Sequence, residues 1–256
     1  MGLVYISLMP TVEPLITGWL TMPKVLFVGG EEGLVRVPVA SFLIRHPKGL
    51  VLFDSGLHPT LADGVSKRLG DDLPPGFAVD GVVDAAQQLR HRGIDPDAIQ
   101  LIINSHLHFD HAGGNILFPN ATVIVQDAEW QAAHDPEMQK AVRYFPEDYQ
   151  TDHAVQTIRG DFDLFGDNTI ECFPTPGHTP GHQSLKVEAD DRKWILAADA
   201  CYMRENLLQM RLPGFVWDED KTRKSLERLA SFRNQGIPVV AGHEPCCFRH
   251  GQMFGV

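Results

Sequence analysis

The chain is poor in cysteine, in basic charge and in long apolar runs, and each shortage excludes a class of protein. Only four of its 256 residues are cysteine, too few for the disulfide framework of a small secreted domain. Lys and Arg number 22 against 33 Asp and Glu, and the formal charge of −11 disfavours a nucleic-acid partner. No run approaches the roughly 18 uninterrupted apolar residues of a membrane helix. The first residues, MGLVYISLMP, lack the features of a signal peptide, so we expect a cytoplasmic protein that does not insert into membranes.

Short apolar runs alternate with helical patterns along the chain, which is typical of an α/β protein. Strands are predicted at 39–45 and 49–54 as a hairpin, and then at 101–104, 121–126, 169–173, 183–187, 194–198 and 238–241. Helices are predicted at 82–93 and 218–236, each closed by a glycine. The Gly-, Pro- and Asp-rich stretch 55–80 is predicted to be a flexible loop. Without a low-complexity linker or a repeat, we expect a single domain over residues 1–256.

The string SHLHFDHAGG, residues 105–114, places four metal-binding side chains within six positions: His106, His108, Asp110 and His111. The string follows a predicted strand, and α/β proteins commonly bind ligands just beyond the carboxyl end of a strand. In an extended turn the first two histidines point the same way, whereas the other two side chains can turn toward a second point. This spacing indicates two metal ions.

Two open metal sites need more ligands than one loop supplies, because a catalytic zinc takes about three protein ligands. Three later strand ends each offer a candidate, namely His178, Asp199 and His243. We assign His106, His108 and His178 to one metal, Asp110, His111 and His243 to the other, and Asp199 as the bridging carboxylate. A single histidine beside a strand is usually only hydrogen-bonded, but the crowded loop favours metal binding. Zinc is the default ion for this ligand set, which also suits Fe, Co and Mn.

The same seven residues, in this order and spread over nearly the whole chain, resemble the ligand pattern of the metallo-β-lactamase superfamily. The resemblance implies an α/β fold of the αββα sandwich type. Two mixed β-sheets would be flanked by helices, with the metal ions at one edge of the two sheets.

Within that superfamily, SHLHFDHAGG, TPGHTPGHQSL and DACY are similar to the quorum-quenching N-acyl homoserine lactone lactonases. The resemblance implies a metal-dependent lactonase with a small-molecule lactone substrate, attacked by a hydroxide held between the two metals. Tyr202, three positions after Asp199, would donate a hydrogen bond to the lactone carbonyl, and Asp110 would pass a proton to the leaving oxygen. Two departures stand out, which are Glu244, where many lactonases have Asp, and the divergent stretch 11–37.

The acyl pocket and the partners are less defined by the sequence. Phe109, Trp19 and Met22 are candidates for the pocket wall, with ordinary core burial as the alternative. The apolar stretch 18–27 also suits a subunit interface, which favours a homodimer. The main alternative function is another hydrolase of the same superfamily, acting on a different lactone, a thioester or an organophosphate. A diiron redox protein is disfavoured because such relatives tend to replace a ligand histidine by Glu, and a nuclease is disfavoured by the acidic charge.

Overall fold

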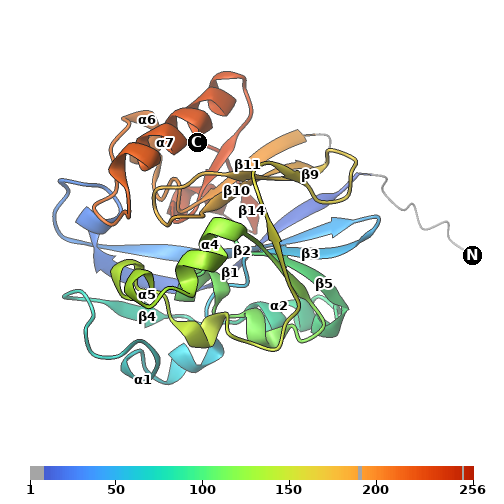
Figure 1. The fold of residues 1–256 in the computed structure, drawn as a ribbon, viewed down its shortest axis with the longest axis horizontal. Coiled ribbons are helices and arrows are strands. Elements are labelled where there is room, and N and C mark those ends of the chain that lie inside the picture. Colours follow the sequence, from blue (N-terminus) through green and yellow to red (C-terminus); the bar gives the residue numbers. More distant parts are fainter. Residues whose placement is uncertain (1–8, 190–191, 250) are drawn as a thin grey trace, which may run out of the picture.

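The computed structural model describes residues 9–189, 192–249 and 251–256, whose strands form two mixed sheets and a short hairpin (Figure 1). The first sheet has the order β4-β1-β2-β3-β5-β6-β7, with β1 (Thr11–Pro23), β2 (Leu34–His46), β3 (Gly49–Phe53), β4 (Ala78–Asp80), β5 (Ile99–Ile103), β6 (Thr122–Gln126) and β7 (Val155–Ile158). The second has the order β12-β11-β10-β9-β8, with β8 (Phe162–Asp163), β9 (Ile170–Pro174), β10 (Gln183–Ala189), β11 (Arg192–Ala198) and β12 (Val239–Ala241). The hairpin pairs β13 (Phe248–Arg249) with β14 (Gln252–Met253).

Helices α2 (Ala85–His91) and α7 (Glu219–Asn234) cover the outer faces of the two sheets, as the predicted αββα sandwich requires. The other helices are α1 (Ser66–Leu69), α3 (Phe109–Ala112), α4 (Asp127–Ala133), α5 (Pro136–Val142) and α6 (Arg204–Leu208). In Figure 1, α7 lies over the second sheet, beside β10 and β11, and α2 lies on the far side of the first sheet. None of the helices in the described part of the chain has the length and apolar character needed to cross a bilayer.

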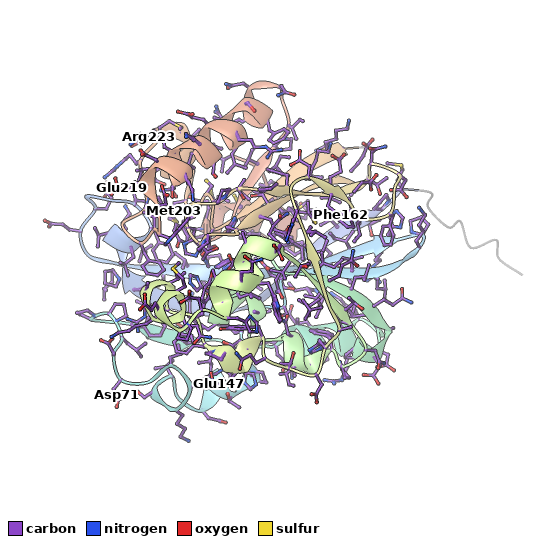
Figure 2. The ribbon with its side chains drawn as sticks, in the orientation of Figure 1. Asp71, Glu147, Phe162, Met203, Glu219 and Arg223 are labelled. Atoms are coloured by element: carbon purple, nitrogen blue, oxygen red, sulfur yellow. The ribbon has the colours of Figure 1, made fainter. Side chains whose placement is uncertain are left out.

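Side chains that alternate between the two faces of each strand build the core. In β2, Phe42 and Ile44 face the second sheet, whereas Leu43 between them packs on the α2 side. Both faces of the first sheet are therefore buried, one by the second sheet and one by α2. Figure 2 shows side chains filling the space between the sheets, while labelled charges such as Glu219 and Arg223 lie on the outside of α7. The result is a rigid frame whose strand ends can hold a site in place.

The predicted elements are largely present, with three corrections. The stretch 55–80 contains α1, β4 and a 3-10 helix (Pro59–Asp63), so it is not simply a loop. Helix α2 starts at Ala85, because Asp84 accepts the backbone N–H of Gln87 at 2.7 Å and caps the helix; Val83 therefore stays outside it and 38% exposed. The apolar stretch 18–27 lies within and just after β1, which the sequence did not predict.

Candidate metal centre

The seven predicted ligands come together at one edge of the sandwich, each just beyond the end of a strand. The loop after β5 carries His106 and His108 and continues into the short helix α3, which carries Asp110 and His111. The second sheet supplies the remaining three: His178 from the turn between β9 and β10, Asp199 directly after β11, and His243 two residues after β12. All seven side chains are buried.

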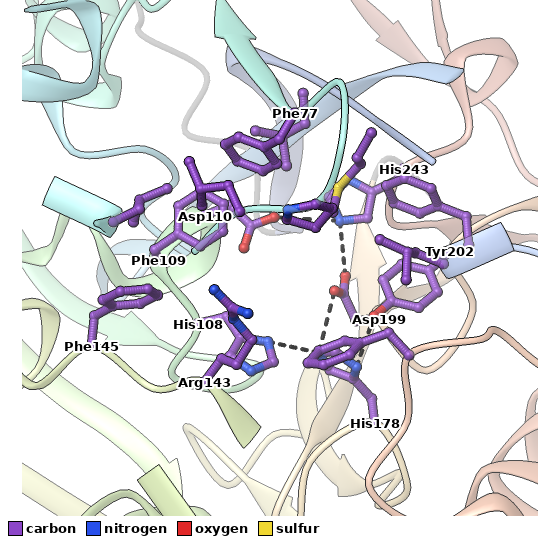
Figure 3. A pocket seen from close by; sticks show the side chains of 18 residues that line it. Phe77, His108, Phe109, Asp110, Arg143, Phe145, His178, Asp199, Tyr202 and His243 are labelled. Atoms are coloured by element: carbon purple, nitrogen blue, oxygen red, sulfur yellow. Dashed lines mark hydrogen bonds and ion pairs between the residues drawn. The ribbon is translucent and has the colours of Figure 1, made fainter. Parts of the chain in front are cut away.

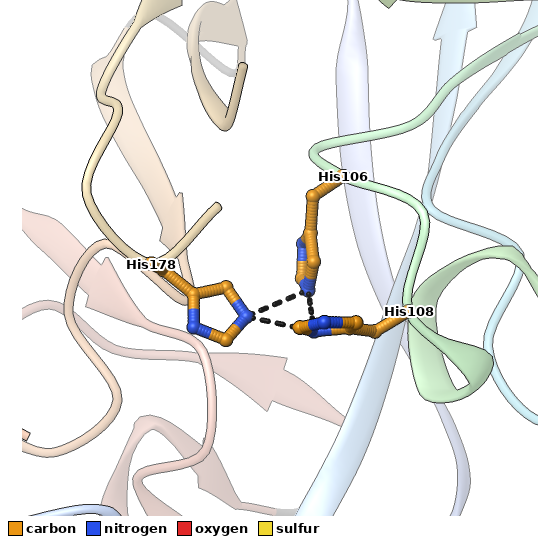
Figure 4. A group of neighbouring side chains, drawn as sticks. All are labelled: His106, His108 and His178. Atoms are coloured by element: carbon orange, nitrogen blue, oxygen red, sulfur yellow. Dashed lines mark hydrogen bonds between the residues drawn. The ribbon is translucent and has the colours of Figure 1, made fainter. Parts of the chain in front are cut away.

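Three imidazoles converge on one point (Figure 4). The Nε2 atom of His106 lies 2.9 Å from Nδ1 of His108, and Nε2 of His178 lies 3.0 Å and 2.8 Å from those two atoms. Burial, followed by the neighbouring imidazoles, holds the pKa of both His106 and His178 well below the ordinary value. A proton shared among these three ring nitrogens can form a hydrogen bond between only two of them, whereas a metal cation can accept the lone pairs of all three.

Asp110, His111 and His243 form a second group. Figure 3 shows the carboxylate of Asp199 between His243 of this group and His178 of the first. One oxygen of Asp199 lies 3.1 Å from Nε2 of His111 and 3.2 Å from Nε2 of His243. Its other oxygen lies 3.5 Å from Nε2 of His178 and 3.8 Å from Nε2 of His106. Asp199 thus faces one group with each oxygen, which is the placement expected of a bridging ligand.

The far ring nitrogens of the histidines are tied to the protein, which fixes which nitrogen faces the centre. The Nδ1 atom of His111 donates to Asp54 at 2.7 Å, and Nδ1 of His243 donates to the carbonyl of Pro38 at 2.8 Å. His108 is turned around, because its Nε2 donates to the carbonyl of Val142 at 2.7 Å and leaves Nδ1 facing the centre.

Asp199 and His178 receive similar support. The Asp199 backbone N–H donates to Nε2 of His182 at 3.1 Å, and Nδ1 of His178 lies 2.8 Å from the Tyr202 hydroxyl. Glu244 does not support the imidazole of His243. It instead accepts the backbone N–H groups of Cys246 and Arg204.

The charge of the site also suits cations. Burial lowers the pKa of His111, but the carboxylates of Asp199, Asp110 and Asp54 outweigh it, and the pKa lies well above the ordinary value. Within the described residues, Nε2 of His111 and one oxygen of Asp199 are buried without a hydrogen-bond partner. Buried carboxylates, converging nitrogens and unpaired polar atoms together are consistent with a dinuclear metal site.

An apolar pocket of about 260 Å³ opens on this centre (Figure 3). Its walls include Leu20, Met22, Phe27, Leu69, Leu73, Pro74, Phe77, Phe109, Phe145, Tyr202 and Phe215. Phe109 contacts Phe77 and Phe145 with ring centroids 6.2 Å away in each case, so aromatic rings line one side. Five candidate ligands line it, namely His108, Asp110, His178, Asp199 and His243, together with Arg143, whose guanidinium binds Asp72 outside the pocket lining.

Two of the three predicted pocket residues line this cavity, and one does not. Met22 and Phe109 are in the wall, whereas Trp19 lies outside the set of described lining residues, under the guanidinium of Arg36 at 4.2 Å. The reason is the two-residue period of a strand. Leu20 and Met22 share one face of β1 and Trp19 points to the other.

Sequence reasoning missed the opposite wall, which comes from the stretch assigned to a loop. Leu69, Leu73 and Phe77 all line the pocket. Their spacing of four residues in an otherwise polar stretch was an available signal. An ion pair between the partly buried Arg68 and the buried Asp148 also joins this segment to the stretch after α5.

Comparisons with known proteins agree with the geometry. A sequence model of the metallo-beta-lactamase superfamily matches residues 34–235. The N-acyl homoserine lactonase AttM of Rhizobium radiobacter is 34% identical over 227 residues, which cover 84% of this chain and 85% of the relative. An N-acyl homoserine lactonase of a Bacillus species is 33% identical over 219 residues, covering 82% and 83%.

Solved structures extend the likeness to three dimensions. An N-acyl homoserine lactone hydrolase with N-hexanoyl-L-homoserine bound at its catalytic metal centre superposes with a TM-score of 0.83 at 27% identity, covering 93% of this chain and 94% of the other. The resemblance found in the sequence is thereby confirmed. The chain belongs to the metallo-β-lactamase superfamily and is a metal-dependent hydrolase related to the N-acyl homoserine lactonases.

Proposed function

We propose that this protein hydrolyses the lactone ring of N-acyl homoserine lactones. The observation that carries the proposal is the apolar pocket of about 260 Å³ opening directly onto the two ligand groups, with Tyr202 in its wall. Such a pocket suits a molecule with a polar ring at the metal centre and an aliphatic chain along the wall. The relatives named N-acyl homoserine lactonases support the same substrate class.

In this proposal the centre would take two divalent ions, zinc by default. His106, His108 and His178 would hold one, Asp110, His111 and His243 would hold the other, and Asp199 would be a ligand to both. When bound, such ions make water nucleophilic near neutral pH and polarise the carbonyl that is attacked.

Tyr202 acts as the hydrogen-bond donor to the lactone carbonyl. His178 presents Nε2 to the centre, so its Nδ1–H donates to the Tyr202 oxygen over 2.8 Å. The tyrosine's own O–H is then left to donate to the substrate oxygen as negative charge develops there. Burial, followed by the charges of Asp199 and Asp110, raises the pKa of Tyr202 well above its ordinary value, so the hydroxyl keeps its proton.

Asp110 is placed to carry the proton released in the reaction. It lines the pocket, with an oxygen 3.6 Å from Nε2 of His243. Opening the ring adds one water across the ester C–O bond. The acyl carbon gains the hydroxyl, and the departing ring oxygen takes a proton, which Asp110 delivers. The product is an N-acyl homoserine.

Mass spectrometry of N-acyl homoserine lactones incubated with zinc-loaded protein tests the proposal directly. We expect a gain of one water above buffer hydrolysis, and acidifying the product should close the ring again. Protein stripped of metal by a chelator is the control and should give no gain.

No gain from protein shown to hold two metal ions would refute the lactonase assignment. In that case the same metal-loaded preparation would be assayed with other lactones, thioesters and organophosphates, the substrates of the alternative hydrolases.

A further inference from the structure

Glu129, the third residue of α4, is a buried carboxylate outside the pocket wall. It is 0% exposed and accepts four hydrogen bonds. One oxygen accepts from the backbone N–H of Leu107 at 3.0 Å and from the Tyr144 hydroxyl at 2.7 Å. The other accepts from the Thr179 hydroxyl at 2.7 Å and from the backbone N–H of Gly181 at 3.0 Å. Burying a carboxylate is costly, and here the cost is offset by a full set of donors.

Three of the four donors, all except Tyr144, belong to the two loops that carry one ligand group. Leu107 lies between His106 and His108, and Thr179 directly follows His178. Each oxygen of Glu129 binds one of the two loops, so a single rigid group spans them. These are the loops whose three imidazole nitrogens meet at 2.8–3.0 Å.

Close packing adds to the hydrogen bonds. A Cβ atom on Gly181 would lie 2.0 Å from the backbone nitrogen of Glu129, too close for any other residue without displacing the loop. The turn that follows His178 is therefore seated directly on the start of α4. The hydrogen bonds of Glu129 and the close backbone contact at Gly181 therefore both hold the turn before β10 at a set distance from the loop after β5.

We propose that Glu129 is a positioning residue for the His106, His108 and His178 group, and that its loss weakens the metal bound there more than the other metal. The proposal rests on the metal assignment under the proposed function. The second group has a different support, because Asp54 binds Nδ1 of His111 at 2.7 Å. Loss of a partner of this kind typically weakens metal binding about 10- to 100-fold.

Glu129→Gln is the informative variant because it keeps the side chain's size. The new amide group is a donor, so whichever loop it faces, Leu107 or Gly181, has a backbone N–H without an acceptor. Metal content per chain is measured by elemental analysis after dialysis against graded chelator, together with the melting temperature of the metal-free protein. Gln126→Met is the matched control. Gln126 directly precedes α4, and its side chain hydrogen-bonds the backbone of Gly160 and the side-chain oxygen of Gln183 in β10, rather than Leu107, Thr179 or Gly181.

We expect wild type and Gln126→Met to retain two metals per chain, and Glu129→Gln to lose one of them at about 10- to 100-fold lower chelator concentration. Two metals retained by Glu129→Gln at wild-type chelator concentrations would overturn the positioning role, whatever the melting temperature. Equal weakening of both metals would overturn the selectivity. If Glu129→Gln does not fold, Thr179→Val removes one donor and should shift one metal in the same direction by less; no shift would refute the proposal. The readout is metal content, so the test of Glu129 does not depend on whether the protein hydrolyses lactones. Fewer than two metals per chain in wild type would refute the metal assignment itself.

Discussion

Removing the Tyr202 hydroxyl, in Tyr202→Phe, should lower turnover far more than it lowers stability. The ring stays in place, edge-on to Phe27 at 5.2 Å between centroids, so the packing is retained. Two hydroxyl interactions are lost, namely the hydrogen bond from His178 at 2.8 Å and the proposed donation to the lactone carbonyl.

The two losses differ in size. A hydrogen bond between neutral groups contributes about 0.5–1.5 kcal/mol, so the loss at His178 should weaken metal binding by about tenfold at most. A donor aimed at developing negative charge is worth about 2.7–4 kcal/mol, or roughly 10²- to 10³-fold in kcat. With metal in excess we therefore expect kcat to fall about 10²- to 10³-fold and KM to change little.

Steady-state kinetics on a six- or eight-carbon N-acyl homoserine lactone, with metal content measured on the same samples, separates the two effects. Tyr149→Phe is the control, since it makes the same chemical change where the hydroxyl donates to the Ala133 carbonyl. A kcat within about threefold of wild type in a Tyr202→Phe protein that holds two metals would refute the donor role. A fall in kcat that excess metal restores would assign Tyr202 to the support of His178 instead.

Three further predictions follow from the site and the pocket. Asp199→Ala removes the carboxylate that faces both ligand groups, so elemental analysis should find fewer than two metals per chain; two retained metals with full activity would contradict the bridging role. Each methylene added to the acyl chain buries apolar area worth about 0.8 kcal/mol, so kcat/KM should rise up to about fourfold per methylene until the pocket is full, and Met22→Trp should end the rise at a shorter chain. Burial raises the pKa of Asp148 to about 6 despite its ion pair with Arg68, so the folded state holds this proton more tightly than the unfolded state. As the pH rises from 4 to 7, the unfolding free energy of wild type should therefore fall by on the order of 2–3 kcal/mol relative to that of Asp148→Asn. Urea titration of both proteins at each pH measures this difference. A difference between these two proteins that does not change with pH would show that the pKa of Asp148 is not raised.

The candidate ligands could be predicted from the sequence because their signals are local. Four lie in one string, and His178, Asp199 and His243 each follow a short apolar strand, whose end in an α/β sandwich commonly lies at a ligand site. The geometry then adds what no string contains, such as the reversed ring of His108 and the two-sided placement of Asp199.

Other features depended on contacts between distant residues. Glu129 binds partners 22 and 50 positions away, and nothing near it in the sequence marks it as different from a surface residue in the first turn of a helix. Strand β1 was missed because its register shifts between Ile16 and Gly18, which breaks the two-residue period that would reveal it. The same loss of period concealed that Trp19 and Met22 face opposite ways.

The origin of the ligands in both sheets has a consequence for the lifetime of the protein. Each ligand group joins the loop after β5, in the first sheet, to a residue of the second sheet, so a bound ion would act as a cross-link between segments up to 133 positions apart, from Asp110 to His243. Binding to the folded chain alone adds about 4 kcal/mol per ion when free metal is a thousandfold above Kd. That is a large share of the 5–15 kcal/mol, or thereabouts, that holds a typical domain folded. Metal supply in the cell would then set how many copies escape unfolding and proteolysis, in addition to how many are active.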